Sequence, residues 1–150
     1  MTEQNTKPAL FDISTLEAVD SANMVVYSNG QPTGWVWTFA GPGHPKAVEL
    51  SNRLSKERLA KEAEQEQARV NGRKWKADTE TPEDSAERNA SYITARLLGW
   101  SDVKLAGEPY PFTTENAKKL LLDPKMGMLV IQALEFLTEQ KSFTKRSATL

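Results

Sequence analysis

The fold is decided by the stretch Gly34–Pro45, which reads GWVWTFAGPGHP. Alternate side chains of an extended strand share one face, so Trp35, Trp37 and Phe39 would lie together on one side of it. Three large aromatic side chains on one face need a cover, which is either a helix of this chain or a partner. The pattern therefore predicts a strand with one heavily aromatic face.

A second strand is predicted just before this stretch, at Met24–Tyr27. The residues between the two strands, Asn29–Gly34, are rich in turn formers. Two short β-prone runs joined by such residues are typical of a β-hairpin. We therefore expect an antiparallel hairpin in the first third of the chain.

A long charged helix is predicted after the hairpin. The glycines and proline of Gly41–Gly43 break the strand, and Pro45 suits the first position of a helix. The helical pattern continues to about Val70, and Asn71-Gly72 ends it. Its apolar stripe is thin, so the helix should project from the body or pair with another helix. The stripe comprises Ala47, Leu50, Leu54, Leu59, Ala63 and Val70.

The C-terminal half reads as mostly helical. We expect a helix from Thr81 to Gly99, a small hairpin within Trp100–Phe112, and a helix from Thr113 to Leu122. A final helix begins at Asp123-Pro124 and carries the most apolar stripe of the chain, which makes it the best candidate for the centre of the core. The stripe comprises Met126, Leu129, Val130, Ala133, Leu134 and Leu137.

These elements predict an α+β fold built from four segments. Residues 1–44 form an N-terminal arm and β-hairpin, and residues 45–72 form the long charged helix. Residues 81–141 form the helical half with the second hairpin, and residues 142–150 form a flexible, basic tail.

The composition limits the classes of function. The 150 residues carry a net charge of −1, so no overall field favours nucleic acid or acidic lipid. There is no cysteine, which excludes disulfides and fits a reducing cytosol. No apolar run approaches the roughly 20 residues of a membrane span, and the polar start lacks the apolar core of a secretory signal. We expect neither a membrane nor a nucleic-acid partner.

The sequence contains no pattern of catalytic, metal-binding or cofactor-binding residues. His44 is the only histidine, and its place before Pro45 indicates a helix-start role. The turn Gly41–Gly43 lacks the length and the Lys-Ser/Thr ending of a phosphate-binding loop. The carboxylates Glu115 and Asp123 pair with nothing that would make an acid–base dyad. We therefore expect a protein that is not an enzyme and needs no cofactor or metal.

Partner binding is the remaining class of function. Trp75 lies among basic residues, which allows base stacking, packing on the body, or a role as an anchor for a protein partner. The neighbouring glutamates and the near-zero net charge argue against nucleic acid. The predicted partner-binding residues are Trp35, Trp37, Trp75, Met128, Ile131 and Phe136.

The chain resembles the tail assembly chaperones of siphoviruses and related small tail-module proteins. The resemblance covers most of residues 11–143 and rests on packing and turn residues. Its motifs are GWVW (34–37), AGPGHP (40–45), VNGRKWK (70–76), LGW (98–100), YPFT (110–113), LLDP (121–124), EF (135–136) and SF (142–143).

This resemblance implies a cytosolic assembly factor made in an infected bacterium. Such proteins coat the long tape measure protein, keep it soluble and help to recruit tail tube subunits, and they are generally absent from the finished particle. The partners implied are thus the phage tape measure protein and the tail tube protein, and self-association stays open. A second reading is a virion structural protein, such as a neck, tail or capsid-associated subunit. A third, an enzyme or host-directed effector, has no supporting motif.

Overall fold

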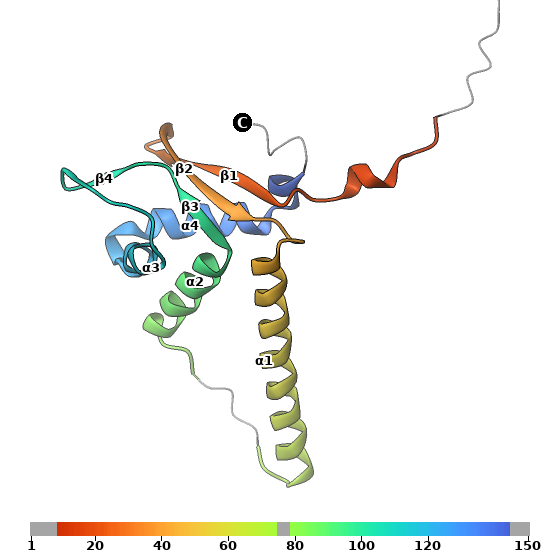
Figure 1. Cartoon of the computed structure of the whole chain (residues 1–150). Coiled ribbons are helices and arrows are strands. Elements are labelled where there is room, and N and C mark those ends of the chain that lie inside the picture. Colours follow the sequence, from red (N-terminus) through yellow and green to blue (C-terminus); the bar gives the residue numbers. More distant parts are fainter. Residues whose placement is uncertain (1–8, 75–78, 145–150) are drawn as a thin grey trace, which may run out of the picture.

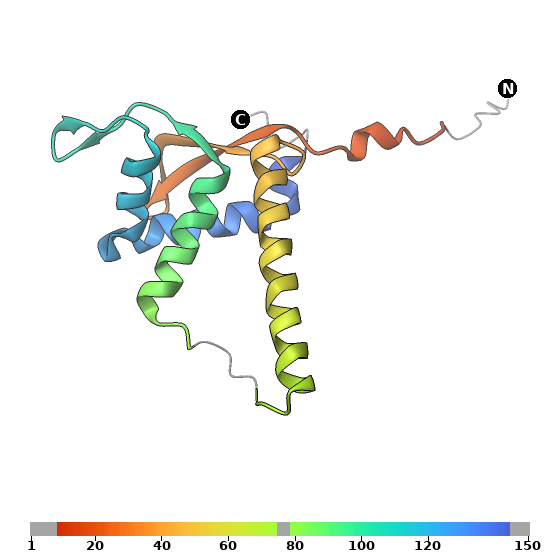
Figure 2. The same cartoon turned by 60° about the horizontal axis from the view of Figure 1, so that its bottom comes forward.

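A computed structural model describes residues 9–74 and 79–144 (Figure 1). It has the predicted α+β fold, with an N-terminal hairpin, a long helix, a helical second half and a later small hairpin. Strands β1 (Ser21–Ser28), β2 (Gln31–Ala40) and β3 (Leu97–Trp100) form an antiparallel sheet in that order. The helices of the second half lie on one face of this sheet (Figures 1 and 2).

The first hairpin closes more tightly than the sequence predicts. Asn29 and Gly30 both have positive φ, 51° and 76°, and Ser28 pairs with Gln31. This is the signature of a two-residue hairpin turn, whose twist matches that of the strands. The wider turn expected over residues 29–34 is therefore wrong, because an Asn-Gly pair alone reverses the chain and leaves the following residues free to join β2.

The turn after β2 depends on a close backbone contact. The N–H of Gly41 donates to the carbonyl of Asp20 at 2.7 Å, and a Cβ at position 41 would clash with the carbonyl oxygen of Val19. The helix start that follows confirms the role expected for His44. Its Nδ1 accepts a hydrogen bond from the N–H of Lys46 at 3.1 Å, which caps the helix.

Helix α1 (Pro45–Val70) has the predicted bounds and is tied to the body only at its start. Ala47 and Leu50 are its buried residues, and Gly72, with φ of 70°, ends it. The helix lies beside α2 (Pro82–Arg96) near the sheet and then extends away from the body (Figures 1 and 2). The predicted projecting helix is thus what the structure contains.

Helix α2 ends three residues earlier than expected. A capping box between Thr81 and Asp84 begins it, as the sequence predicts. Leu97 is extended, and Leu97–Trp100 becomes β3 instead of the last turn of the helix. The prediction that the helix continues to Gly99 is wrong, because pairing with β2 satisfies the backbone of these residues: Trp100 lies opposite Trp37, and Gly99 lies opposite Thr38.

The second hairpin is smaller than expected. It consists of β4 (Lys104–Leu105) and β5 (Glu108–Pro109), joined through Ala106 and Gly107, which both have positive φ. The indole N–H of Trp100 donates to the carbonyl of Tyr110 at 3.1 Å, and the two rings stack with centroids 6.0 Å apart. This contact fixes the base of the hairpin against β3.

The remaining helices follow the predicted order. They are α3 (Thr114–Leu122), with Thr113 as its cap, the short 3-10 helix η2 (Pro124–Met126), and α4 (Gly127–Thr138). Two further 3-10 turns flank the body, η1 (Ile13–Leu16) near the N-terminus and η3 (Gln140–Phe143) after α4. Asp12 caps the first of these turns, η1.

The flexible tail predicted from Ser142 begins too early. Ser142 and Phe143 are both buried, and the carbonyl of Phe143 accepts a hydrogen bond from Val19 at 2.9 Å. The ring of Phe143 also packs on Phe136 and lies 4.8 Å from the guanidinium carbon of Arg96. An apolar ring with these neighbours stays inside the fold, although the surrounding sequence is polar and basic.

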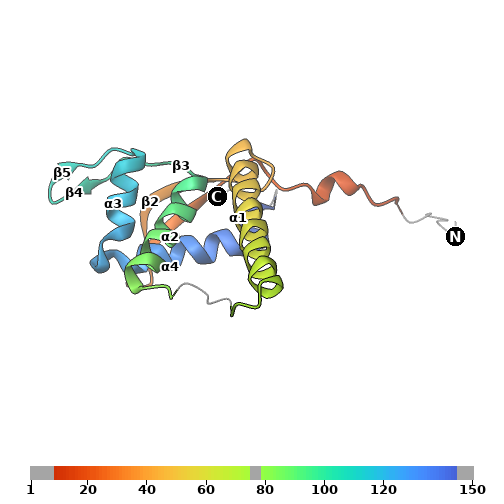
Figure 3. The ribbon, with the colours of Figure 1, turned by 90° about the horizontal axis from the view of Figure 1, so that it is seen from below.

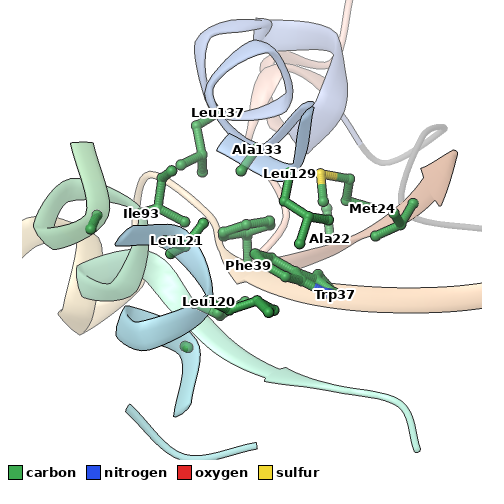
Figure 4. Packing of buried hydrophobic residues seen from close by; sticks show 14 of the residues in the cluster. Ala22, Met24, Trp37, Phe39, Ile93, Leu120, Leu121, Leu129, Ala133 and Leu137 are labelled. Atoms are coloured by element: carbon green, nitrogen blue, oxygen red, sulfur yellow. The ribbon is translucent and has the colours of Figure 1, made fainter. Parts of the chain in front are cut away.

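One core joins the hairpin to the helical half (Figure 4). Trp37 and Phe39 of β2 are fully buried, and helices α2, α3 and α4 of this chain cover them. The aromatic face of β2 is therefore covered from within. The principal helical residues of this core are Ile93, Leu120, Leu121, Leu129, Ala133 and Leu137.

Candidate partner-binding surfaces

The three tryptophans of the sheet form a ring cluster that belongs mainly to the core. Trp35 makes edge contacts with Trp37 and Trp100, with centroids 5.2 and 5.4 Å apart. Trp37 is 0% exposed, so the prediction that it binds a partner is wrong. Helices α2, α3 and α4 of the same chain cover it. Trp35 is only partly buried and remains at the margin of this cluster.

Phe136 also packs mainly inward. It is partly buried, and its ring lies 5.6 Å from that of Phe39 and 5.4 Å from that of Phe143. Its place between a strand and the last 3-10 turn gives it a packing role that accounts for its position on α4. Trp75, the other predicted anchor, lies outside the described residues.

Met128 and Ile131 are the predicted site residues that the structure leaves open to a partner. They are 66% and 50% exposed, respectively, and are one helical turn apart on the outer side of α4. Glu135 and Thr138 continue the same exposed side toward the end of the helix. We call Met128 and Ile131 the α4 ridge. Because Leu129 and Ala133 hold the opposite side of α4 in the core, the ridge is carried by a fixed helix.

A second apolar surface was not predicted from the sequence. Residues 10–17, here called the arm, extend away from the body in all three views (Figures 1, 2 and 3). Its four large apolar side chains are between 68% and 97% exposed. They are Leu10, Phe11, Ile13 and Leu16. Four such residues within seven positions could have indicated an apolar surface. They were not recognised because their spacing follows neither strand nor helix periodicity.

Hydrogen bonds within the arm give it a local structure. The carboxylate of Asp12 accepts from the hydroxyl of Ser14 at 2.8 Å and from its N–H at 3.0 Å. These bonds, led by the one from the hydroxyl, hold the pKa of Asp12 below its usual value. The capped turn η1 therefore presents the apolar side chains of the arm on a short ordered segment.

A groove lies between α1 and α2. Two adjoining hollows of about 400 and 560 Å³ share Leu50, Leu54 and Tyr92 as their apolar lining. We call this the α1–α2 groove. Its charged lining is predominantly positive: four arginines and one glutamate line the two hollows, namely Arg53, Arg58, Arg88, Arg96 and Glu57.

The four arginines of the groove differ in their partners. Arg96 is buried and donates twice to the carbonyl of Ala40, and Arg88 forms an ion pair with Glu80 at 2.6 Å. Arg53 and Arg58 form no salt bridge with any residue that the structure describes. The groove thus offers an apolar floor beside two arginines that form no salt bridge with described residues.

Among residues 9–74 and 79–144, no group of three or more His, Asp or Glu side chains is placed to hold a metal ion. Within the same residues, no helix combines the length and apolar character needed to cross a membrane.

Comparison with known proteins adds no relative. No family model, curated protein or solved structure matches the chain.

Proposed function

We propose that this chain is a tail assembly chaperone similar to those of siphoviruses. In this role it binds a tape measure protein without catalysing a reaction, keeps it soluble in the host cytoplasm and helps to recruit tail tube subunits. The sequence resemblance supplies the identity of the client. The α4 ridge is the single structural observation that carries the proposal, because it exposes two large apolar side chains on a helix that the core already holds in place.

The chemistry of the ridge suits a helical client. An amphipathic helix binds through apolar side chains spaced three or four residues apart, which matches the spacing of Met128 and Ile131. Methionine adapts its shape to different neighbours, which is useful for a client that offers many similar segments. A ridge of this size buries little area, so each contact is weak and the chaperone can leave when tube subunits arrive.

The charged helix α1 supports the same role. Its exposed residues are mostly polar, ten of them being Glu, Lys or Arg, and most of its length makes no contact with the core. A charged projection that stays in water raises the solubility of a complex whose client is rich in apolar surface. In this proposal α4 contacts the client and α1 keeps the complex dispersed.

Co-expression tests the proposal. We expect a tape measure protein from the same virus to be soluble and to copurify with the wild-type chain. Ile131→Asp, combined with Met128→Asp, should reduce the captured client by about tenfold or more without lowering the melting temperature of the chain. The matched control is Val48→Asp, an exposed apolar position on α1, which should capture the client normally. Equal capture by the ridge variant and the wild type would refute the role of the ridge.

A virion structural protein is the second candidate. The arm and α1 both extend from the body, and projecting segments suit permanent contacts between subunits (Figures 1 and 2). A structural subunit would remain in the particle in a fixed number of copies, whereas a chaperone would leave it.

A further inference from the structure

We infer that two copies of this chain form a dimer in which the arm of each copy lies in the α1–α2 groove of the other. The inference is independent of the proposed function, because a chaperone and a structural subunit could both dimerise in this way.

The apolar side chains of the arm are largely exposed among the residues that the structure describes. Val19, just beyond the arm, is fixed to the body by its hydrogen bond to the carbonyl of Phe143. From that point the arm extends away from α1, α2 and the sheet in all three views (Figures 1, 2 and 3). A run of four exposed apolar side chains on one short segment is a typical binding element, because leaving it in water is unfavourable.

The α1–α2 groove fits such a segment in its chemistry. Its floor is formed by Leu50, Leu54 and Tyr92, which can cover the apolar side chains of a short turn. Beside the floor lie Arg53 and Arg58, which form no salt bridge with a described residue, together with a single carboxylate, Glu57. The preferred occupant is therefore an apolar segment that carries negative charge.

The arm carries negative charge. Between Lys7 and Lys46 the sequence contains three acidic residues and no lysine or arginine. Two of the three acidic residues, Asp12 and Glu17, belong to the arm. The arm is thus both apolar and acidic, and the groove is both apolar and basic. This complementarity within one sequence identifies a second copy of the chain as the occupant.

The position of the groove allows two copies to exchange their arms. A third hollow, at the base of the arm, is lined by Leu16 and shares Pro42 and Arg96 with the groove. The arm therefore leaves the body next to the place where an incoming arm would bind. A two-fold axis between two copies then fills both grooves with both arms and leaves neither surface open.

Sedimentation equilibrium of the full chain tests the dimer over roughly a hundredfold range of concentration. We expect a monomer–dimer equilibrium. Phe11→Asp in the arm and Leu54→Asp in the groove should each raise the dimer dissociation constant by more than about tenfold. If Leu54→Asp does not fold, Arg58→Glu is the second groove variant, with the same expected direction. The matched control is Met128→Asp, which places the same charge at an apolar residue of α4 that is about as exposed as Phe11, and it should leave the dimer intact.

Mixing the two variants gives the decisive result. The Phe11→Asp chain keeps a sound groove and the Leu54→Asp chain keeps a sound arm, so the mixture should form a heterodimer held by one arm, although each variant alone is monomeric. A wild-type chain that is monomeric throughout, as docking of the arm on its own groove would produce, would overturn the inference. So would a dimer that survives both variants, or a mixture with no heterodimer. Met128→Asp alters the α4 ridge but neither the arm nor the groove. A dimer that persists in this variant therefore shows that dimerisation does not depend on the proposed client-binding surface.

Discussion

Gln132 on α4 exchanges two hydrogen bonds with the backbone of Tyr27 on β1. The N–H of Tyr27 donates to Oε1 at 2.8 Å, and Nε2 donates to the carbonyl of Tyr27 at 2.9 Å. Strand β1 is at the edge of the sheet. The side-chain amide therefore satisfies backbone groups of β1 that a neighbouring strand would otherwise pair with.

Loss of this amide should loosen the contact between α4 and the sheet. Gln132→Ala removes both hydrogen bonds, and at about 0.5–1.5 kcal/mol for each bond we expect the free energy of unfolding to fall by about 1–3 kcal/mol. Gln132→Glu keeps the shape and the acceptor but loses the donor, so its effect should be intermediate. Urea denaturation measures both. An unchanged midpoint for Gln132→Ala would show that water replaces the amide without cost.

The turn after β2 should tolerate no side chain at Gly41. In Gly41→Ala the new Cβ would clash with the carbonyl oxygen of Val19, so the strand ends must move apart, and we expect a loss of about 1–3 kcal/mol or more. Gly43→Ala is the matched control, because nothing lies within 4 Å of a Cβ built there. Thermal unfolding of the two variants compares them directly. Equal melting temperatures would contradict the tight contact between residues 19 and 41.

Two isoleucines can be used to distinguish the core from the proposed client surface. Ile93 is fully buried, and its replacement by alanine should cost about 2–5 kcal/mol. Ile131 is half exposed, so Ile131→Ala should stay within about 0.5 kcal/mol of the wild type. Chemical denaturation gives both values. A large loss for Ile131→Ala would place that residue in the core and remove it from the α4 ridge.

The cap of the arm should depend on pH. Hydrogen bonds from Ser14 favour the charged carboxylate of Asp12 and lower its pKa, so the cap contributes fully above the usual value of 3.8 and is lost as the pH falls through the lower folded value. An NMR titration should show the Ser14 amide resonance moving in this acidic range. Asp12→Asn, which can cap without titrating, should abolish that movement. A Ser14 resonance that titrates equally in both proteins would refute the assignment to Asp12.

The local elements were readable from the sequence because their signals are local. Pro45 and Gly72 bracket α1, and the histidine cap at position 44 follows from its place before the proline. The aromatic face of β2 was also predicted, together with its need for a cover. Each of these features depends on residues within a few positions of one another, which is the range over which sequence patterns carry information.

The features that were missed depend on distant partners. Leu97–Trp100 is a strand only because β2, about 60 residues earlier, offers it an edge to pair with. Phe143 is buried because Phe136 and Arg96 lie around it, although its own neighbours in the sequence are polar. Trp37 was assigned to a partner for the same reason, since the sequence does not show which helices close over it. The arm was missed because exposure is a property of the whole fold.

The most direct test of the central claim is quantitative mass spectrometry of purified virus particles beside a lysate of infected cells. A tail assembly chaperone should be abundant in the lysate and absent from the particles. A fixed copy number of this chain in the particles would contradict that account and would instead support a structural subunit.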